Sequence, residues 1–96
     1  MLENIELGSP LKHDFKVMST KENIFMKDLI ITEARDILSS DHVVPSVERE
    51  ENYTSLIINV PKDLKEEIKA YCSMNDIRIR DFWIECIRKS MERYNG

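Results

Sequence analysis

Residues 54–72, TSLIINVPKDLKEEIKAYC, decide the fold. The first seven residues are rich in β-branched side chains and alternate in hydrophobicity, which predicts a strand that ends before Pro61. Proline suits the first turn of a helix, and apolar residues then recur at helical spacing at Leu64, Ile68 and Cys72. A single strand leaves half of its backbone donors and acceptors unpaired, so this strand needs a neighbour from elsewhere.

The predicted strand has two chemically different faces, because side chains alternate across a strand. One face carries Leu56, Ile58 and Val60, and the other carries Ser55, Ile57 and Asn59. A second helix is predicted over about residues 80–94. Its stripe of apolar residues is broad: Ile79, Phe82, Trp83, Cys86, Ile87 and Met91. Strand and helices of this size expose more apolar surface than a unit of about 45 residues can bury alone.

The sequence before the strand has a different character. Residues 1–18 show weak periodicity and predict a loop or a disordered segment. Ser19 and Glu22 form a capping box that predicts one helix over about residues 20–39, and residues 39–52 have the composition of a linker. We therefore expect two parts: a tail at 1–52, which contains the helix and an acidic linker, and a compact module at 53–96.

Charge separates the same two parts. The chain has a net charge of −4, and residues 1–50 hold six basic against ten acidic side chains, whereas residues 51–96 hold eight of each. An acidic front half attached to a neutral, well-patterned module is typical of a partner-binding segment joined to a folded domain.

Several classes of protein are excluded or disfavoured. Two glycines cannot build a phosphate-binding loop, and the N-terminus lacks the apolar core of a signal peptide. No apolar run is long enough to span a bilayer, so we expect a cytoplasmic protein without a membrane contact. Cys72 and Cys86 lie on apolar helix faces, and His13 and His42 lack ligand spacing, so no metal or other cofactor is expected. Ser39, Ser40, Asp41 and His42 are adjacent in sequence, unlike a hydrolase triad, and no enzyme is expected.

The order strand, helix, short turn, helix over about residues 53–95 resembles the ribbon-helix-helix family of DNA-binding proteins. The resemblance rests on SLIINVP, on the first helix with Leu64, Ile68 and Tyr71, on the turn MNDIRI, and on Ile79 and Phe82. It implies a mainly α protein with one short strand, in which two chains form an intertwined homodimer around a two-stranded antiparallel ribbon. A flexible N-terminal segment with one helix would precede this module. The implied dimer core comprises Leu56, Ile58, Val60, Leu64, Ile68, Phe82, Trp83 and Ile87.

The resemblance also implies a DNA-binding surface. The outward ribbon residues Ser55, Ile57 and Asn59 would contact bases in the major groove, where Asn can bond adenine and Ile can touch a thymine methyl. The alternatives are an apolar cover over Ile57 and ordinary solvated polar groups at the other two positions.

Backbone phosphates would be bound where the second helix begins. The residues expected there are Arg78, Ile79 and Arg80, and Lys62, just after the ribbon, is expected to reach a phosphate as well. The alternative is a solvated charged surface in which these cations pair with Asp76, Asp81 and Glu66.

The role that follows is centromere binding in plasmid partition, transcriptional autorepression, or both. In partition proteins of this family an N-terminal tail contacts a segregation ATPase, and Phe25, Leu29, Ile31 and Arg35 would form that partner surface here. Higher-order assembly on double-stranded DNA is a further expectation. Two alternatives remain: an antitoxin-type repressor, and a ribbon-helix-helix dimer that binds proteins and does not read DNA.

Overall fold

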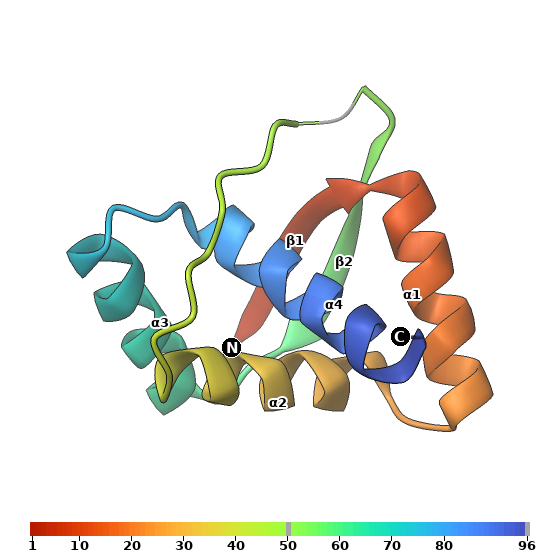
Figure 1. Ribbon diagram of the computed structural model, residues 1–96, viewed down its shortest axis with the longest axis horizontal. Helices are drawn as coiled ribbons and strands as arrows, with labels where there is room; N and C mark the ends of the chain where they lie inside the picture. The colour runs from red at the N-terminus through yellow and green to blue at the C-terminus, as the bar shows by residue number, and fades with distance from the viewer. Residues whose placement is uncertain (50, 96) are drawn as a thin grey trace.

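The computed structural model describes residues 1–49 and 51–95 of the chain. It contains two strands and four helices, in the order β1 (Leu2–Gly8), α1 (Ser9–Glu22), α2 (Met26–Leu38), β2 (Tyr53–Asn59), α3 (Lys62–Met74) and α4 (Ile79–Asn95). The strands lie side by side, α4 crosses them, and the other three helices surround this centre (Figure 1). We call the pair of strands the ribbon.

The partner of the predicted strand is a second strand of the same chain. β1 pairs with β2 in antiparallel register, from Leu2 opposite Asn59 to Gly8 opposite Tyr53. The predicted fold class, an intertwined homodimer with one strand per chain, is therefore wrong. A chain that supplies both strands satisfies the inner edge of each strand without a second copy.

The predicted flexible N-terminal segment is also wrong. Residues 2–8 form β1, and Pro10 lies in the first turn of α1, where its missing N–H costs no helical hydrogen bond. Two helices replace the single predicted helix at 20–39. The helical structure is interrupted between them at Asn23, whose left-handed backbone angle φ of 56° ends α1.

The predicted capping box does not start a helix. Ser19 lies in the last turns of α1, and its hydroxyl donates a hydrogen bond to the Ile24 carbonyl instead. This bond fastens the turn between α1 and α2. The sequence pattern had the right spacing, but it lies at the C-terminal end of a helix, where the hydroxyl can reach a free carbonyl group.

Both halves of the chain contribute to one hydrophobic core. It contains Ile5 and Phe15 from the first half and Phe82 and Trp83 from the second, all almost inaccessible to solvent. The edge-on contact of Phe82 with Tyr71, at a ring-centroid distance of 5.8 Å, joins α3 to α4, and Phe82 makes a similar contact of 5.7 Å with its neighbour Trp83 within α4. Helices α2 and α4 pack against each other over the middle of this core.

The order strand, helix, helix occurs twice, and the two copies are 53 residues apart. Helix α3 begins 53 residues after α1, and α4 begins 53 residues after α2. The two positive backbone angles fall at the same offset, with φ of 56° at Asn23 and 54° at Asp76. Asn4 and Ile57 are also 53 residues apart and lie directly opposite each other in the ribbon. A pseudo-twofold axis therefore passes between Asn4 and Ile57, at the centre of the ribbon.

Residues 40–49, which we call the connector, join the two copies without regular secondary structure. The connector leaves the end of α2 and passes across α4 (Figure 1). Val44 is buried in the core, and the Tyr71 hydroxyl donates a hydrogen bond of 3.2 Å to the His42 carbonyl oxygen. The predicted linker is thus an ordered segment as far as Arg49.

Candidate nucleic-acid interface

One face of the ribbon points away from the helices. Burial alternates along both strands, so the residues that face outward come from each of them. They form three cross-strand pairs: Leu2 with Asn59, Asn4 with Ile57, and Glu6 with Ser55. The predicted base-contacting residues Ser55, Ile57 and Asn59 all lie on this face. Ile57 is 63% exposed, and no apolar segment among residues 1–49 and 51–95 covers it.

The starts of two helices flank this face on opposite sides. The first turn of α2 and the residues around Ile57 line a groove of about 360 Å³. On the other side, Ile79 and Arg80 at the start of α4 line a groove of about 290 Å³ with Asn4 and Glu6. The free N–H groups of a helix start favour anions, whereas the carboxylates of Asp28 in the first groove and of Glu3 and Glu6 in the second oppose them.

Cations lie beside the ribbon rather than on it. Lys27 is exposed in the α2 groove, and the Lys12 ammonium donates a hydrogen bond of 2.7 Å to the Ser55 carbonyl. Arg49 lies 3.8 Å above the ring of Tyr53 and forms an ion pair of 3.2 Å with Glu6. This arrangement leaves polar and apolar side chains at the centre of the face and positive charge at its margins.

The predicted phosphate-binding arginines are engaged by the connector. Arg78 donates to the Val47 carbonyl at 2.9 Å and to Asp81 at 2.9 Å, and Arg80 also donates to the Val47 carbonyl. Arg80 keeps a buried Nε without a hydrogen-bond partner among the described residues. Lys62, in contrast, is exposed at the first residue of α3. The structure therefore places Ile79 and Arg80 in the groove beside the ribbon, whereas the contacts of Arg78 are with the connector and Asp81. The connector occupies part of the hydrogen-bonding capacity of both arginines.

A buried ion pair supports the ribbon from beneath. Glu3 faces inward from β1, where its carboxylate pairs with the Lys65 ammonium and accepts a hydrogen bond of 3.2 Å from the Trp83 indole N–H. All three side chains are buried. This network ties the first strand to α3 and α4 of the second copy, and so fixes the orientation of the ribbon relative to the helices.

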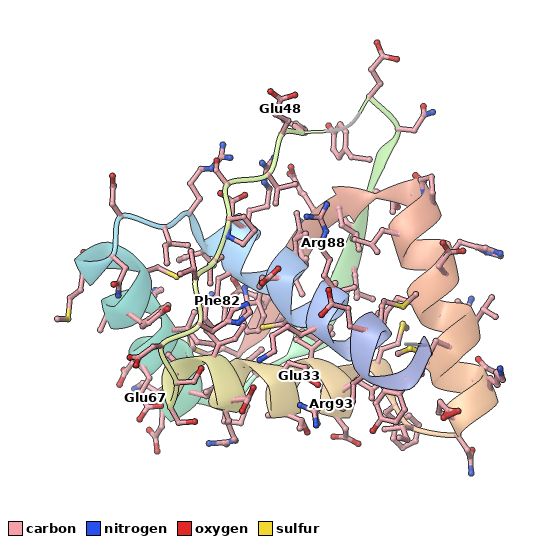
Figure 2. All side chains as sticks on the ribbon, viewed as in Figure 1. Glu33, Glu48, Glu67, Phe82, Arg88 and Arg93 are labelled. Carbon is pink, nitrogen blue, oxygen red and sulfur yellow. The ribbon has the colours of Figure 1, made fainter. Side chains whose placement is uncertain are left out.

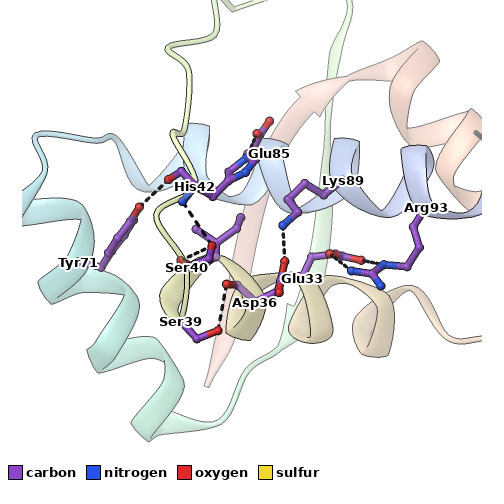
Figure 3. Close-up of polar contacts among 10 residues, drawn as sticks. Glu33, Asp36, Ser39, Ser40, His42, Tyr71, Glu85, Lys89 and Arg93 are labelled. Atoms are coloured by element: carbon purple, nitrogen blue, oxygen red, sulfur yellow. Dashed lines mark hydrogen bonds and ion pairs between the residues drawn. The ribbon is translucent and has the colours of Figure 1, made fainter.

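The predicted partner surface is divided between core and surface. Leu29 is buried in the core and Ile31 is partly buried against it, whereas Phe25 is 79% exposed and Arg35 is exposed. Helix α2 is held through its other side by ion pairs with α4, in which Lys89 contacts Asp36 and Arg93 contacts the buried Glu33 (Figure 3). The residues predicted as a dimer core are also buried, but inside a single chain.

Sequence reasoning missed the first strand and its outward residues Leu2, Asn4 and Glu6. The signal was present in LENIELG, because Ile5 and Leu7 alternate with polar residues and Pro10 follows as Pro61 follows β2. Glu3 conceals the pattern, since it places a charge where an inward apolar residue is expected. Lys27 and Lys12 were missed because they reach β2 from α2 and α1, a contact between distant parts of the chain that no local pattern reveals.

The comparisons with known proteins give one informative relative. No family model matches the chain, and no solved structure matches it. Uncharacterized protein 13 of Sulfolobus islandicus filamentous virus is 40% identical over 45 residues, which are 47% of this chain and 82% of the viral protein. The chain belongs to the family of this viral protein. The matched region is about as long as one strand-helix-helix copy.

The described residues offer few other sites. They contain no group of three or more His, Cys, Asp or Glu side chains placed to hold a metal ion. Within the same ranges, 1–49 and 51–95, none of the helices combines the length and apolar character needed to cross a bilayer. The ribbon face with its two flanking grooves is therefore the candidate interface.

Proposed function

We propose that this protein binds double-stranded DNA through the outward face of the ribbon and acts as a transcriptional regulator. The observation that carries the proposal is the placement of that face between the starts of α2 and α4. A two-stranded ribbon fits the width of the major groove, and helix starts on both sides of it would meet the phosphates that border the groove. The resemblance of residues 53–95 to ribbon-helix-helix proteins supports the same function.

The side chains on the face suit base contacts, and those at its margins suit phosphate contacts. Asn4 and Asn59 carry amides that can bond base edges, and Ile57 offers a branched apolar group for a thymine methyl. Lys27 and Lys62 are exposed cations at the margins that can contact phosphates. Phosphate contacts would supply most of the affinity, and base contacts would supply the selectivity.

One lysine variant and one arginine variant, both on α2, test the proposal. Binding of a fluorescent duplex is measured by anisotropy across a range of salt concentrations. We expect Lys27→Ala to weaken binding to all sequences and to reduce the slope of log K against log salt by about 1. Arg35→Ala is the matched control, because it removes the same charge from an exposed position about 12 Å further along α2.

The contrary result is also well defined. Equal effects of Lys27→Ala and Arg35→Ala would mean that the charge of the whole molecule, and not the ribbon margin, attracts DNA. Absence of salt-dependent binding to any duplex would refute DNA binding. Circular dichroism of both variants confirms that the fold is retained.

We favour transcriptional regulation over plasmid partition. Part of the helix assigned to a segregation ATPase is built into the core, because Leu29, Ala34 and Ile37 of α2 are buried. A free tail that could fold on a partner ATPase is therefore replaced by a helix with a structural task. Addition of a segregation ATPase should leave DNA binding unchanged.

A second candidate function is protein binding through the same face. It is favoured by exposed apolar side chains, since Leu2 is 75% exposed and Phe25 and Ile57 are also prominent. Ile57→Ser separates the two functions. It should reduce selectivity among DNA sequences if the face binds DNA, and leave DNA binding unaffected if the face binds a protein.

A further inference from the structure

The two strands of the ribbon present different chemistry at equivalent positions. The offset of 53 residues makes Leu2 equivalent to Ser55, Asn4 equivalent to Ile57, and Glu6 equivalent to Asn59. Each equivalence joins unlike groups: an alkyl group with a hydroxyl, an amide with an alkyl group, and a carboxylate with an amide. A ribbon made from two identical strands would instead present each group twice, related by the twofold axis.

The orientation of this unsymmetrical face is fixed by the interior. Glu3 has Leu56 as its equivalent in the second copy, so only β1 carries an inward charge. Its carboxylate forms an ion pair with Lys65 and accepts a hydrogen bond from Trp83, both in the second copy. Exchange of the two strands would place a leucine at this ion pair and leave the buried ammonium without a partner. Each strand therefore has a fixed place relative to α3 and α4, and the outward residues of the ribbon have a single arrangement.

The two ends of the face favour different base edges. At one end Glu6 lies opposite Ser55, and a carboxylate accepts a hydrogen bond from the amino group of cytosine. At the other end Asn59 lies opposite Leu2. Its Oδ1 accepts a hydrogen bond of 2.9 Å from the amino nitrogen of Met1, which leaves the amide N–H groups to donate to an acceptor such as guanine O6 or thymine O4.

We infer that the ribbon recognises a non-palindromic duplex site, with one chain bound to each site. This inference rests on the proposed function. A twofold-symmetric protein dimer mirrors a palindromic operator, because identical elements contact identical half-sites. Here the approximate twofold axis relates elements of similar shape and different chemistry, so the two halves of the site must differ in sequence.

The experiment selects bound sequences from a pool of randomised duplexes, and native mass spectrometry counts the chains in each complex. We expect an enriched motif that differs from its own reverse complement, with one chain per motif. Asn59→Ala should relax the preference at one end of the motif only, and Glu6→Gln should relax it at the opposite end.

A triple substitution provides the sharpest test. Leu2→Ser, Asn4→Ile and Glu6→Asn together give β1 the same outward residues as β2, and all three positions lie on the face turned away from the core. The selected motif should then become palindromic while still binding one chain. Circular dichroism and the thermal transition confirm that the variant is folded.

The possible failures are distinguishable. A palindromic motif for the unaltered chain, with Asn59→Ala relaxing two symmetry-related positions, would mean that two chains pair identical strands, and would overturn the inference while DNA binding stands. Salt-dependent binding without any enriched motif would also overturn it. Absence of binding to every duplex at low salt would refute the proposed function, and this inference with it.

Discussion

At the scale of single residues, charged side chains at inward positions determine how the chain is put together. Glu3 stands where the strand pattern calls for an apolar residue, and its partner Lys65 is 62 positions away. We expect Glu3→Leu to lower the free energy of unfolding by about 3–5 kcal/mol, because it leaves the Lys65 ammonium buried without its counter-ion. Urea denaturation followed by circular dichroism measures the loss.

The double variant Glu3→Leu with Lys65→Leu is the control for this prediction. Replacing both members of a buried pair by apolar groups removes the unpaired charge, so most of the lost stability should return. A Glu3→Leu protein as stable as the unaltered chain would show that the pair does not hold the ribbon.

Asp36 gives the protein a dependence on pH in acid. The hydrogen bond from Lys89, and next the charge of Lys89, lower the pKa of Asp36 below its ordinary value of 3.8. The unfolded chain therefore takes up this proton at higher pH than the folded protein. The resulting stabilisation is present above about pH 4 and is lost as the pH falls through the lowered pKa of the folded protein.

Lys89→Met should accordingly make stability fall less steeply in this acid range, whereas Lys69→Met on the exposed side of α3 should not. The measurement is urea unfolding at a series of pH values on either side of pH 4. Identical pH profiles for the unaltered chain and Lys89→Met would contradict the assignment (the pair is drawn in Figure 3).

Both cysteines are expected to be chemically inert in the folded protein. Burial is the main cause that raises the pKa of Cys72 to about 11, and burial also raises the pKa of Cys86. Because the thiolate is the reactive form, iodoacetamide at mildly alkaline pH should modify neither side chain until denaturant unfolds the chain. Mass spectrometry of the native protein would refute this if it found rapid single modification.

At the scale of elements, each copy of strand-helix-helix depends on the other. β2 pairs with β1, and α4 packs against α2, so residues 53–96 alone lose both neighbours. We expect this fragment to show no cooperative unfolding as a monomer, and an equimolar mixture with residues 1–49 to regain helical structure and a cooperative transition. A native-like thermal transition for monomeric 53–96 would mean that the second copy folds independently.

A point variant makes the same test in the intact chain. Ile5 is fully buried on the inward side of β1, and Ile5→Lys places a charge there without a partner. Val17→Lys on α1 is the matched control, since the same charge is then added at an exposed position. The first variant should unfold the protein and the second should not.

At the scale of the whole molecule, one chain pairs its own strands and buries its own apolar helix faces, which the sequence pattern assigned to a dimer. All four helices contribute side chains to one core, and Glu33 of α2 meets Arg93 of α4 beside it (Figure 2). Folding should therefore need no second copy, and the melting temperature should not change with protein concentration over about a hundredfold range. Sedimentation is expected to give a mass near 11.3 kDa. A melting temperature that rises with concentration would restore coupled folding and dimerisation.

The second half of the chain was largely determined by its own sequence. Alternation placed a strand where β2 lies and separated inward Leu56 and Ile58 from outward Ile57, and the helical stripes located α3 and α4. These features are local, because residues within a few positions of one another already show which side is buried. The same reasoning correctly placed Cys72 and Cys86 in apolar surroundings.

Only the tertiary structure decided the first half and the source of the second strand. β1 looks polar in sequence because it contains Glu3 at an inward position. This carboxylate is stabilised there by Lys65 and Trp83, distant residues that no local pattern can reveal. Once β1 is in place, α1 and α2 complete a second copy with the same offset, and one chain closes the ribbon on itself. The candidate interface follows from that closure, because three of its six outward residues belong to β1, and pairing between strands about fifty residues apart is a property of the folded chain.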